Sequence, residues 1–365
     1  MERILVIGMS DDCGGIENYL FNMYEHINRN QIQFDFLVKG AIGKDFQSRI
    51  TNLGGRIYET GILKKNILFT WKRIEEIIKQ GTYKKIYINL SYALALLYVL
   101  PGLKNGITQV FIHSHASDDF RKMKHYISRP FLLKAINKYA TGYYLGCSEE
   151  ACYWMFGKKR SQKHGYQIIQ NAIDYDKFVY NKKTATQVRN ELGLKDAFVV
   201  GHVGRFSEEK NHSFIIRAFE ELYKRNKNTR LLLIGDGYLK SEIEEQIEKL
   251  GLKDVTRLTG VVRDPERYYN VMDCFWMPSL YEGFPLVAIE AEANGLFCIF
   301  SDHITKSVDI LGSNVFLPID QIDCFVKRTE EIKKDYNRKT ERKVFMNAGF
   351  DINNEVERLE KILLQ

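Results

Sequence analysis

The chain has 365 residues, of which 45% are hydrophobic and 27% charged, a composition that excludes collagen-like, low-complexity and mainly disordered proteins. Its length is enough for two domains of ordinary size, each with its own core. The net charge of +7 is unevenly distributed: residues 1–174 carry 24 Lys and Arg against 15 Asp and Glu, whereas residues 175–365 carry 29 against 31. This asymmetry is typical of a first half that meets an anionic partner, such as lipid head groups, nucleic acid or a phosphorylated substrate, although a generic solvated surface also fits it.

The first half alternates short apolar strands with amphipathic helices. Gly14 and Gly15 turn the chain from the first strand into a helix whose apolar residues recur every three or four positions. We expect strands at residues 3–8, 34–38, 56–59, 85–89, 109–113, 143–146 and 167–170, and helices at residues 16–27, 45–53, 69–79 and 92–100. This alternation predicts a parallel sheet with helices on both faces.

The second half repeats this pattern after a polar stretch, residues 171–184, which we interpret as the loop that joins two domains. We expect strands at residues 198–203, 230–234, 255–258, 274–277 and 297–301, and helices at residues 211–225, 238–250, 264–272 and 285–294. The sequence therefore predicts two tandem Rossmann-like, doubly wound α/β domains, residues 1–172 and 173–345, with a cleft between them. A last helix in residues 346–365 is expected to pack back on the first domain. In such sheets ligands bind at the carboxyl ends of the strands.

Membrane-spanning, secreted and metal-binding proteins are disfavoured. The longest apolar run, residues 92–100, is too short to span a bilayer as a helix and is followed by Pro101. The N-terminus leads at once into a strand and lacks the features of a secretion signal. The six cysteines are scattered and form no C-x-x-C pair, which argues against a disulfide framework or zinc site and is typical of a reducing cytosol. We therefore expect a cytoplasmic protein without a metal centre.

Residues 279–291 form the strongest candidate site. The chain leaves a buried strand, passes through a glycine-containing loop and enters a helix with Pro285 at its first position, where proline is favoured. A carboxylate next to a phosphate at a helix N-terminus is electrostatically unfavourable. Such a carboxylate makes sense only if it accepts hydrogen bonds from hydroxyl groups. A nucleotide-sugar supplies such hydroxyls near Glu282 and Glu290. The backbone N–H groups expected to bind its phosphates are those of Gly283, Phe284, Leu286 and Val287.

Two cations follow the first strand of the second domain. Arg205 offers a planar fork to phosphate oxygens and Lys210 a compact charge, so together they can neutralise a diphosphate leaving group. In the first domain, His113 and His115 end a strand that we expect to face the cleft. A shift of one or two residues in register exchanges the roles of these histidines, and a purely structural role is the alternative for each. An H-x-H metal site lacks a third ligand.

These segments resemble the retaining glycosyltransferases of family 4, which have the GT-B fold. Glu282 and Glu290, with Gly-Phe-Pro after the first, resemble the E-x7-E motif of that family. The segment 204–211 resembles its diphosphate-binding loop, and residues 168–174 its interdomain segment. The G-G-I-E pattern and the His-Ser-His strand end resemble bacterial enzymes of capsular polysaccharide, exopolysaccharide and O-antigen assembly. Residues 14–17 and 233–237 complete the match.

The resemblance implies that the second domain binds a nucleoside diphosphate sugar, most simply a UDP-sugar. Arg205 and Lys210 would hold the diphosphate, Glu290 the ribose and Glu282 the sugar that is transferred. His113 or His115 would act near that sugar, and the loop of Gly14 and Gly15 would border the acceptor and the diphosphate. Transfer would proceed with retention and without a metal or other cofactor. Asp309 stands near a position where many members carry Glu, and its role is left open.

The first domain is expected to bind a glycan acceptor, and residues 121–139 suggest how. This stretch carries six Lys and Arg residues and no acidic one, interleaved with apolar residues. It predicts peripheral binding to an anionic membrane, where the acceptor would be lipid-linked, although a packed helix with a solvated basic face is the alternative. Nucleic-acid binding is not expected, because no module of that kind accompanies the charge.

Two other functions remain as alternatives. A nicotinamide oxidoreductase is disfavoured because Gly235-Asp-Gly237 is followed by Lys240 where the dinucleotide fingerprint needs its third glycine. A non-catalytic subunit that binds nucleotide-sugars is disfavoured because both carboxylates and both cations are present.

Overall fold

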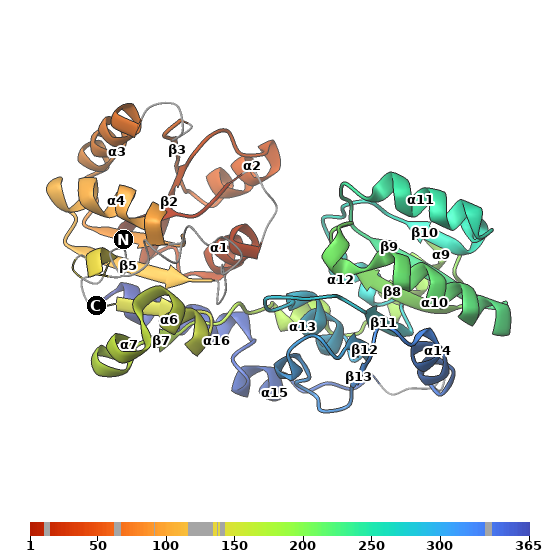
Figure 1. Ribbon diagram of the computed structural model, residues 1–365. Coiled ribbons are helices and arrows are strands. Elements are labelled where there is room, and N and C mark those ends of the chain that lie inside the picture. The colour runs from red at the N-terminus through yellow and green to blue at the C-terminus, as the bar shows by residue number, and fades with distance from the viewer. Residues whose placement is uncertain are drawn as a thin grey trace. The chain divides into compact units, whose positions relative to one another are not determined.

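The computed structural model describes residues 1–10, 15–61, 67–90, 92–115, 134–136, 138, 143–332 and 338–365 (Figure 1). The chain divides into two compact units, Met1–Ala172 with Ile352–Gln365, and Ile173–Asp351. Both are α/β units built on a parallel sheet, as the alternation of strands and helices predicts.

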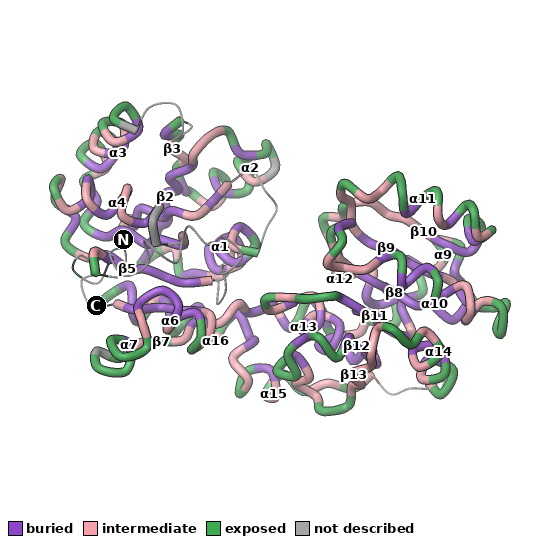
Figure 2. Tube along the Cα trace, in the orientation of Figure 1, coloured by how far each residue is buried: buried purple, intermediate pink, exposed green. Residues whose placement is uncertain are grey.

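The first unit contains a seven-stranded sheet in the order β3-β2-β1-β4-β5-β6-β7. Its strands are β1 (Glu2–Ile7), β2 (Ile32–Val38), β3 (Ile57–Glu59), β4 (Lys85–Ile88), β5 (Gln109–Ser114), β6 (Tyr143–Gly146) and β7 (Gln167–Ile168). The helices named here are α1 (Gly15–His26), α2 (Lys44–Asn52), α3 (Ile67–Gly81), α4 (Tyr92–Lys104), α6 (Glu149–Phe156), α7 (Lys158–His164) and α16 (Ile352–Leu363). Central strands are buried along their length, as expected for a parallel sheet covered on both faces (Figure 2).

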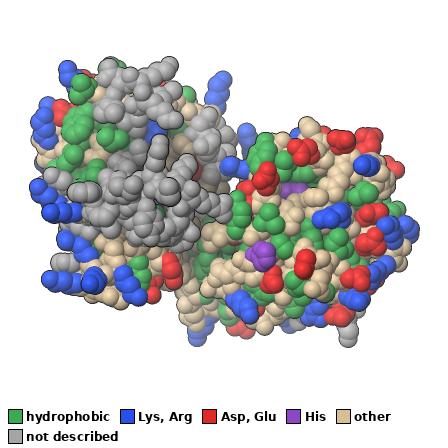
Figure 3. Space-filling model, in the orientation of Figure 1, with side chains coloured by type: hydrophobic (Ala, Val, Ile, Leu, Met, Phe, Trp, Pro, Cys, Tyr) green, Lys and Arg blue, Asp and Glu red, His purple; other side chains and the backbone are tan. Residues whose placement is uncertain are grey.

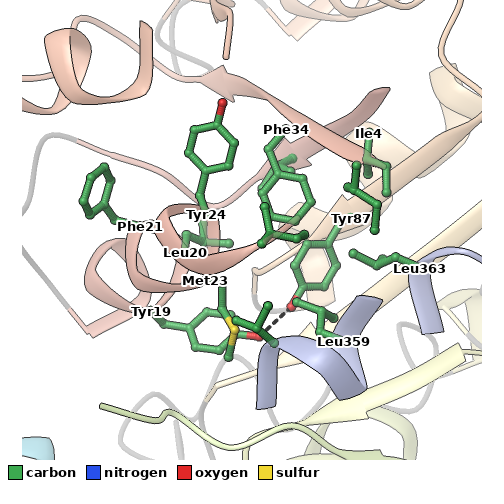
Figure 4. Close-up of a cluster of buried hydrophobic side chains, with 14 of the residues drawn as sticks. Ile4, Tyr19, Leu20, Phe21, Met23, Tyr24, Phe34, Tyr87, Leu359 and Leu363 are labelled. Atoms are coloured by element: carbon green, nitrogen blue, oxygen red, sulfur yellow. Dashed lines mark hydrogen bonds between the residues drawn. The ribbon is translucent and has the colours of Figure 1, made fainter. Parts of the chain in front are cut away.

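The last helix, α16, completes the core of the first unit (Figure 4). Leu359 and Leu363 are fully buried and lie in the same apolar cluster as residues of β1, β2 and α1. Nζ of Lys85, on β4, donates a 2.6 Å hydrogen bond to the carbonyl of Leu363. The carboxylate of Glu355 accepts a hydrogen bond from the backbone of Gln170 across 2.9 Å. The C-terminal helix is therefore an integral part of this unit.

The second unit contains a six-stranded sheet in the order β10-β9-β8-β11-β12-β13. Its strands are β8 (Phe198–Val203), β9 (Thr229–Ile234), β10 (Thr256–Leu258), β11 (Cys274–Met277), β12 (Phe297–Ser301) and β13 (Val315–Leu317). The α-helices named here are α8 (Tyr175–Phe178), α9 (Lys182–Glu191), α10 (His212–Arg225), α11 (Lys240–Lys249), α12 (Pro265–Tyr269), α13 (Leu286–Ala293), α14 (Ile322–Glu330) and α15 (Arg342–Asn347). Both sheets share one topology, in which the chain reverses direction across the sheet after the third strand.

Two local predictions are wrong. The stretch 171–184 is not a loop: it contains α8 and the start of α9, because Tyr175 and Phe178 bury their rings in the core of the second unit. Pro285 is not the first helical residue. Its extended backbone, with φ −82° and ψ 100°, places it before α13, which begins at Leu286. Among the described residues, none of the helices is both long and apolar enough to cross a membrane.

Candidate functional site

The predicted site residues of the second unit lie where its strand order reverses, between β8 and β11. These strands are parallel neighbours, so the segments that follow them leave the same edge of the sheet. One segment carries Arg205 and Lys210, and the other carries Glu282. A backbone hydrogen bond of 2.8 Å from Leu280 to the carbonyl of Glu209 joins the two segments directly. Crevices at such reversal points are the usual ligand sites of doubly wound sheets.

Lys210 and Glu282 form an ion pair. Nζ of Lys210 donates to Oε1 of Glu282 across 2.6 Å, and only 15% and 10% of the two side chains are exposed. The sequence predicts both residues in one site, but it does not predict that they contact each other. The contact places a cation beside the carboxylate and so removes the electrostatic objection to an acidic residue at an anion site.

The loop geometry that brings them together depends on unusual backbone conformations. Asn211 adopts a left-handed conformation with φ 56°, and its amide donates a 3.1 Å hydrogen bond to the carbonyl of Pro278. Gly235 has φ 139°, and a Cβ atom there would lie 2.0 Å from the carbonyl oxygen of Gly204. A Cβ atom at Gly237 would lie 2.3 Å from the carbonyl oxygen of Phe206. The Gly-Asp-Gly motif therefore serves close packing of loops, consistent with its mismatch to the dinucleotide fingerprint.

The start of α13 offers free backbone donors. Ala288 donates to the carbonyl of Pro285 across 3.1 Å. Within the described part of the chain, no backbone hydrogen bond is donated by the four residues predicted to bind phosphate, Gly283, Phe284, Leu286 and Val287. Orphan N–H groups of this kind, at the positive end of a helix dipole, favour an anion.

Glu290 lies one turn into α13 and contacts a residue that the sequence analysis missed. The hydroxyl of Tyr269, at the end of α12, donates a hydrogen bond to Oε2 of Glu290 across 2.7 Å. Burial raises the pKa of Glu290 to about 7, against the opposing effect of this hydrogen bond. The carboxyl group is therefore about half protonated near pH 7.

Arg205, which with Lys210 is predicted to bind the diphosphate, lies exposed in the loop after β8.

Glu292 and Asp309 are structural. Oε2 of Glu292 accepts hydrogen bonds from the backbone of Ile310 and Leu311 at 2.8 and 2.9 Å, and Oε1 accepts from the amide of Asn314 at 2.6 Å. That amide also donates to Oδ1 of Asp309 across 2.8 Å. Asp309 and Glu292 therefore fasten the loop after β12 to α13. Residues two positions apart on a helix point to different faces, so Glu292 does not share the face of Glu290. This spacing could have shown from the sequence that Glu292 has a separate, structural role.

In the first unit, His113 is fully engaged in hydrogen bonds. Its Nε2 lies 3.1 Å from the carbonyl of Ile169, which can only accept, so Nε2 carries the hydrogen. Nδ1 of the neutral ring is then an acceptor, and the hydroxyl of Tyr87 donates to it across 2.6 Å. The Tyr87 oxygen in turn accepts from the hydroxyl of Tyr19 at 2.9 Å. Burial, and next the neighbouring His115, lower the pKa of His113 well below its usual value, as this neutral state requires.

His115 has polar neighbours of a different kind. Its Nε2 lies 2.8 Å from Oδ1 of Asn89, and its Nδ1 lies 3.3 Å from Oδ1 of Asn171. The ring also contacts Tyr19, with centroids 4.6 Å apart. Burial lowers the pKa of His115 to about 4, so it is neutral at physiological pH. Among the described residues, the hydrogen-bond partners of its ring are the side-chain amides of Asn89 and Asn171, whereas His113 also bonds to a backbone carbonyl.

Other predicted features are less defined. Gly15 is exposed at the start of α1, whereas Gly14 lies outside the described residues. Most of the basic stretch, residues 121–139, also lies outside them, and within it Lys134 and Lys138 are exposed. The five described cysteines are free, and no group of three potential metal ligands is found in the described ranges.

A cavity of about 640 Å³ lies in the second unit, away from the predicted site. Its lining includes Phe198, the first residue of β8, and Asp273, which precedes β11, so it borders the edge where the strands begin. Arg189 and Asp273 form an ion pair of 2.7 Å in its wall. On the visible face of the second unit, acidic and basic side chains lie interspersed (Figure 3). The segments that carry Arg205, Lys210 and Glu282 follow β8 and β11 and so lie at the opposite edge of this sheet.

The two units, each built on a doubly wound parallel sheet, have the architecture of the GT-B fold. HepE of Anabaena, solved in complex with UDP-glucose, shares the fold with a TM-score of 0.76 over the whole of both chains, at 17% identity. Residues 184–349 match the family model described as "Glycosyl transferases group 1". EpsF of Bacillus subtilis, which is named as a glycosyltransferase, is 31% identical over 314 residues, 84% of this chain and 81% of that protein. The chain therefore belongs to the group 1 glycosyltransferases.

A more distant relative carries a more specific name. It is the N-acetylgalactosamine-N,N'-diacetylbacillosaminyl-diphospho-undecaprenol 4-alpha-N-acetylgalactosaminyltransferase of Campylobacter jejuni. The two are 29% identical over 157 residues, which cover 43% of this chain and 40% of that protein.

Proposed function

We propose that this glycosyltransferase moves a sugar, with retention, from a UDP-sugar to a hydroxyl group of a lipid-linked precursor of a surface polysaccharide. The observation that carries the proposal is the Lys210–Glu282 pair beside the unbonded N–H groups at the start of α13. This combination offers both positive charge for a diphosphate and a carboxylate for a sugar hydroxyl.

Each part of the site has a task in this scheme. Lys210 and Arg205 stabilise the diphosphate as negative charge develops on it, together with the free N–H groups of α13. Glu290 accepts hydrogen bonds from the ribose, and Glu282 from the transferred sugar. Because side-chain cations and a helix N-terminus neutralise the leaving group, the scheme requires no metal ion and no other cofactor.

His113 and His115 take different parts. His113 has no hydrogen-bonding capacity left for a substrate, so we assign it to the scaffold that fixes the end of β5. His115 is the better candidate to meet the reacting sugar. The acceptor would bind the first unit, and residues 121–139 would hold the enzyme peripherally on the anionic inner face of the cytoplasmic membrane. The diphospho-undecaprenol acceptor in the name of the Campylobacter relative supports a lipid-linked acceptor.

The donor is tested with purified protein and a panel of nucleotide sugars, with UDP-, GDP- and ADP-linked members, in a thermal-shift assay. The nucleotide sugar that stabilises the protein is then incubated with membrane lipids that carry diphospho-undecaprenol sugars, and the linkage of the product is determined by NMR. An α-linked product from an α-linked donor supports retention. Binding without turnover of any acceptor would favour the non-catalytic subunit, and inversion would overturn the proposed mechanism.

A further inference from the structure

Buried polar atoms without partners concentrate near the predicted donor site. Among the described residues, seven buried side-chain nitrogen or oxygen atoms have no hydrogen-bond partner, and four of them belong to His202, His212 and Ser279. His202 is on β8, His212 begins α10, and Ser279 follows β11. Buried polar groups are nearly always paired, so this concentration beside Lys210 and Glu282 requires an explanation.

The hydrogen bond to Trp276 fixes the tautomer of His202. Nδ1 lies 2.8 Å from the carbonyl oxygen of Trp276, on the neighbouring strand β11. A carbonyl can only accept, so Nδ1 carries the hydrogen and Nε2 of the neutral ring carries an unused lone pair. The side chain is fully buried, and Nε2 has no hydrogen-bond partner among the residues that the structure describes, so this lone pair is unpaired and out of contact with solvent.

Nε2 of His202 points toward the loop that carries the predicted diphosphate ligands. A Cβ atom built on Gly204 would lie 3.0 Å from Nε2 of His202 and 3.4 Å from the Cγ and Cδ atoms of Lys210. The imidazole and the lysine stem therefore lie on the same side of Gly204. The ring of His212 stands perpendicular to that of His202, with centroids 5.0 Å apart.

Burial and the groups around His202 keep it neutral. Burial, and next His212 and Lys210, lower the pKa of His202 well below its usual value, while the Trp276 carbonyl opposes them. Glu209 raises the pKa of His212, but burial and Lys210 outweigh it and lower that pKa to about 4. Glu282 affects the charge near His202 indirectly, because it forms an ion pair with Lys210. Burial is thus the main effect that opposes protonation of either ring, and Lys210 adds to it in both cases.

We propose that His202 takes up a proton when the donor diphosphate binds and so becomes a third cation beside Arg205 and Lys210. The proton comes from solvent and forms an N–H bond at Nε2, while the Nδ1 hydrogen stays on Nδ1 and remains hydrogen-bonded to the Trp276 carbonyl, and no bond between heavy atoms changes. The negative diphosphate offsets the repulsion from Lys210, and loss of the proton restores the neutral ring when the nucleotide leaves. The inference rests on the proposed function and makes His202 a positioning residue that is charged only in the occupied enzyme.

NMR of protein labelled with 13C-histidine tests the protonation directly. The Cε1–H signal of His202 is identified by its loss in His202→Asn. At pH 6.5 we expect this signal to move from the neutral to the imidazolium position on saturation with UDP-glucose, or with the nucleotide sugar that the panel selects. The signal of His26, on α1 in the first unit, serves as the control and should not move. A neutral His202 signal in the saturated enzyme would overturn the inference.

Two variants separate this role from packing. His202→Asn keeps an amide donor for the Trp276 carbonyl, and His202→Phe keeps an aromatic ring at this position in place of the imidazole. Both should weaken nucleotide-sugar binding by about tenfold at pH 6.5 and by much less at pH 8.5, where the imidazolium is lost in the parent enzyme as well. Equal weakening at both pH values would indicate packing alone and reject the inference.

His212→Phe is the matched control. The ring nitrogens of His212 have no hydrogen-bond partner within the described structure, so a phenyl ring preserves the contacts of this side chain with His202 and Phe206. Proton uptake by His202 should persist in this variant. If no nucleotide sugar of the panel binds the parent enzyme, the proposed function fails and the inference with it. If one binds and His202 stays neutral, only the inference fails.

Discussion

The hydroxyl of Tyr269 and the carboxyl group of Glu290 share a 2.7 Å hydrogen bond between α12 and α13. The bond stabilises the ionised carboxylate, yet burial outweighs it and raises the pKa of Glu290 to about 7. In the proposed scheme this group accepts hydrogen bonds from ribose hydroxyls, and with a pKa of about 7 it is half protonated at neutral pH. Its function and its contribution to stability should therefore both be sensitive to pH.

Donor binding should weaken as pH falls through 7. Above that value Glu290 is ionised and, in the proposed scheme, accepts hydrogen bonds from the ribose hydroxyls, whereas the protonated form accepts them less well. Titration calorimetry of the selected nucleotide sugar between pH 6 and 8.5 measures this, with the His202→Asn variant used to remove the opposing effect proposed for that residue. Glu290→Gln should bind weakly and show no dependence on pH in that background. A dependence that persists in the Gln variant would reject the assignment.

The stability of the protein should respond to the same group in the opposite sense. The pKa of Glu290 is higher in the folded chain than its ordinary value of 4.5, so its contribution to stability is complete below pH 4.5 and is lost as pH rises through 7. Glu290→Gln should therefore raise the free energy of unfolding at pH 8 by about 1–3 kcal/mol and change it little at pH 5. Chemical denaturation at the two pH values provides the comparison.

Removal of Lys210 should abolish most of the transfer activity. Lys210→Ala deletes a cation that lies 2.6 Å from Glu282 and, in the proposed scheme, stabilises the leaving diphosphate. We expect kcat/KM to fall by about a hundredfold or more. Lys240→Ala is the matched control, because Lys240 forms a more exposed pair with Asp236 in the same unit and should be nearly silent. Near-normal transfer by purified Lys210→Ala would refute its role.

His113 and His115 should respond differently to substitution. Tyr87→Phe removes the hydroxyl that donates to His113, so we expect a lower melting temperature and a kcat/KM within about fivefold of the parent. His115→Asn should lower kcat/KM by about a hundredfold or more with little change in melting temperature. Steady-state kinetics and thermal unfolding of both variants measure the contrast. The reverse result would exchange the roles that we assign to the two histidines.

The helix α16 should contribute directly to the stability of the first unit. Leu359→Ala removes a fully buried side chain from its core and should lower the free energy of unfolding by about 2–5 kcal/mol. Glu357→Ala changes an exposed residue of the same helix and should lower it by less than about 0.5 kcal/mol. Hydrogen exchange of β1 and of β8 shows which unit is affected. Faster exchange confined to β8 would contradict this account.

Binding to anionic membranes should depend on the basic stretch. Replacement of Lys122, Lys124 and Lys134 by Gln should reduce sedimentation with vesicles that contain phosphatidylglycerol, by roughly tenfold at low salt. Vesicles of phosphatidylcholine alone should bind neither protein. Unchanged sedimentation of the triple variant would leave the segment without a role at the membrane.

The sequence predicts the fold well because the signals are local and strong. The central strands, such as residues 274–277, are short apolar runs bounded by helices, and that pattern determines a parallel sheet. Predictions failed where packing between distant segments decides the structure. The rings of Tyr175 and Phe178 are buried in the core of the second unit, so the stretch that reads as a loop in the sequence contains helix instead.

The site is predicted only in part for the same reason. Lys210 and Glu282 stand in recognisable motifs, but their contact across 72 residues follows from the pairing of β8 and β11. Tyr269 and His202 belong to no motif, and their relevance appears only when their partners are known. His113 and His115 are equivalent in sequence, and only their hydrogen-bond partners distinguish them.

The return of α16 to the first unit has a consequence for biosynthesis. The strands of that unit emerge early from the ribosome, yet Leu359 and Leu363, which close its core, are made only after the whole of Ile173–Asp351. The second unit is continuous in the chain and can fold as soon as it is synthesised, whereas the first must wait with an uncovered apolar surface. We expect nascent chains that stall before residue 352 to be held by chaperones through the first unit.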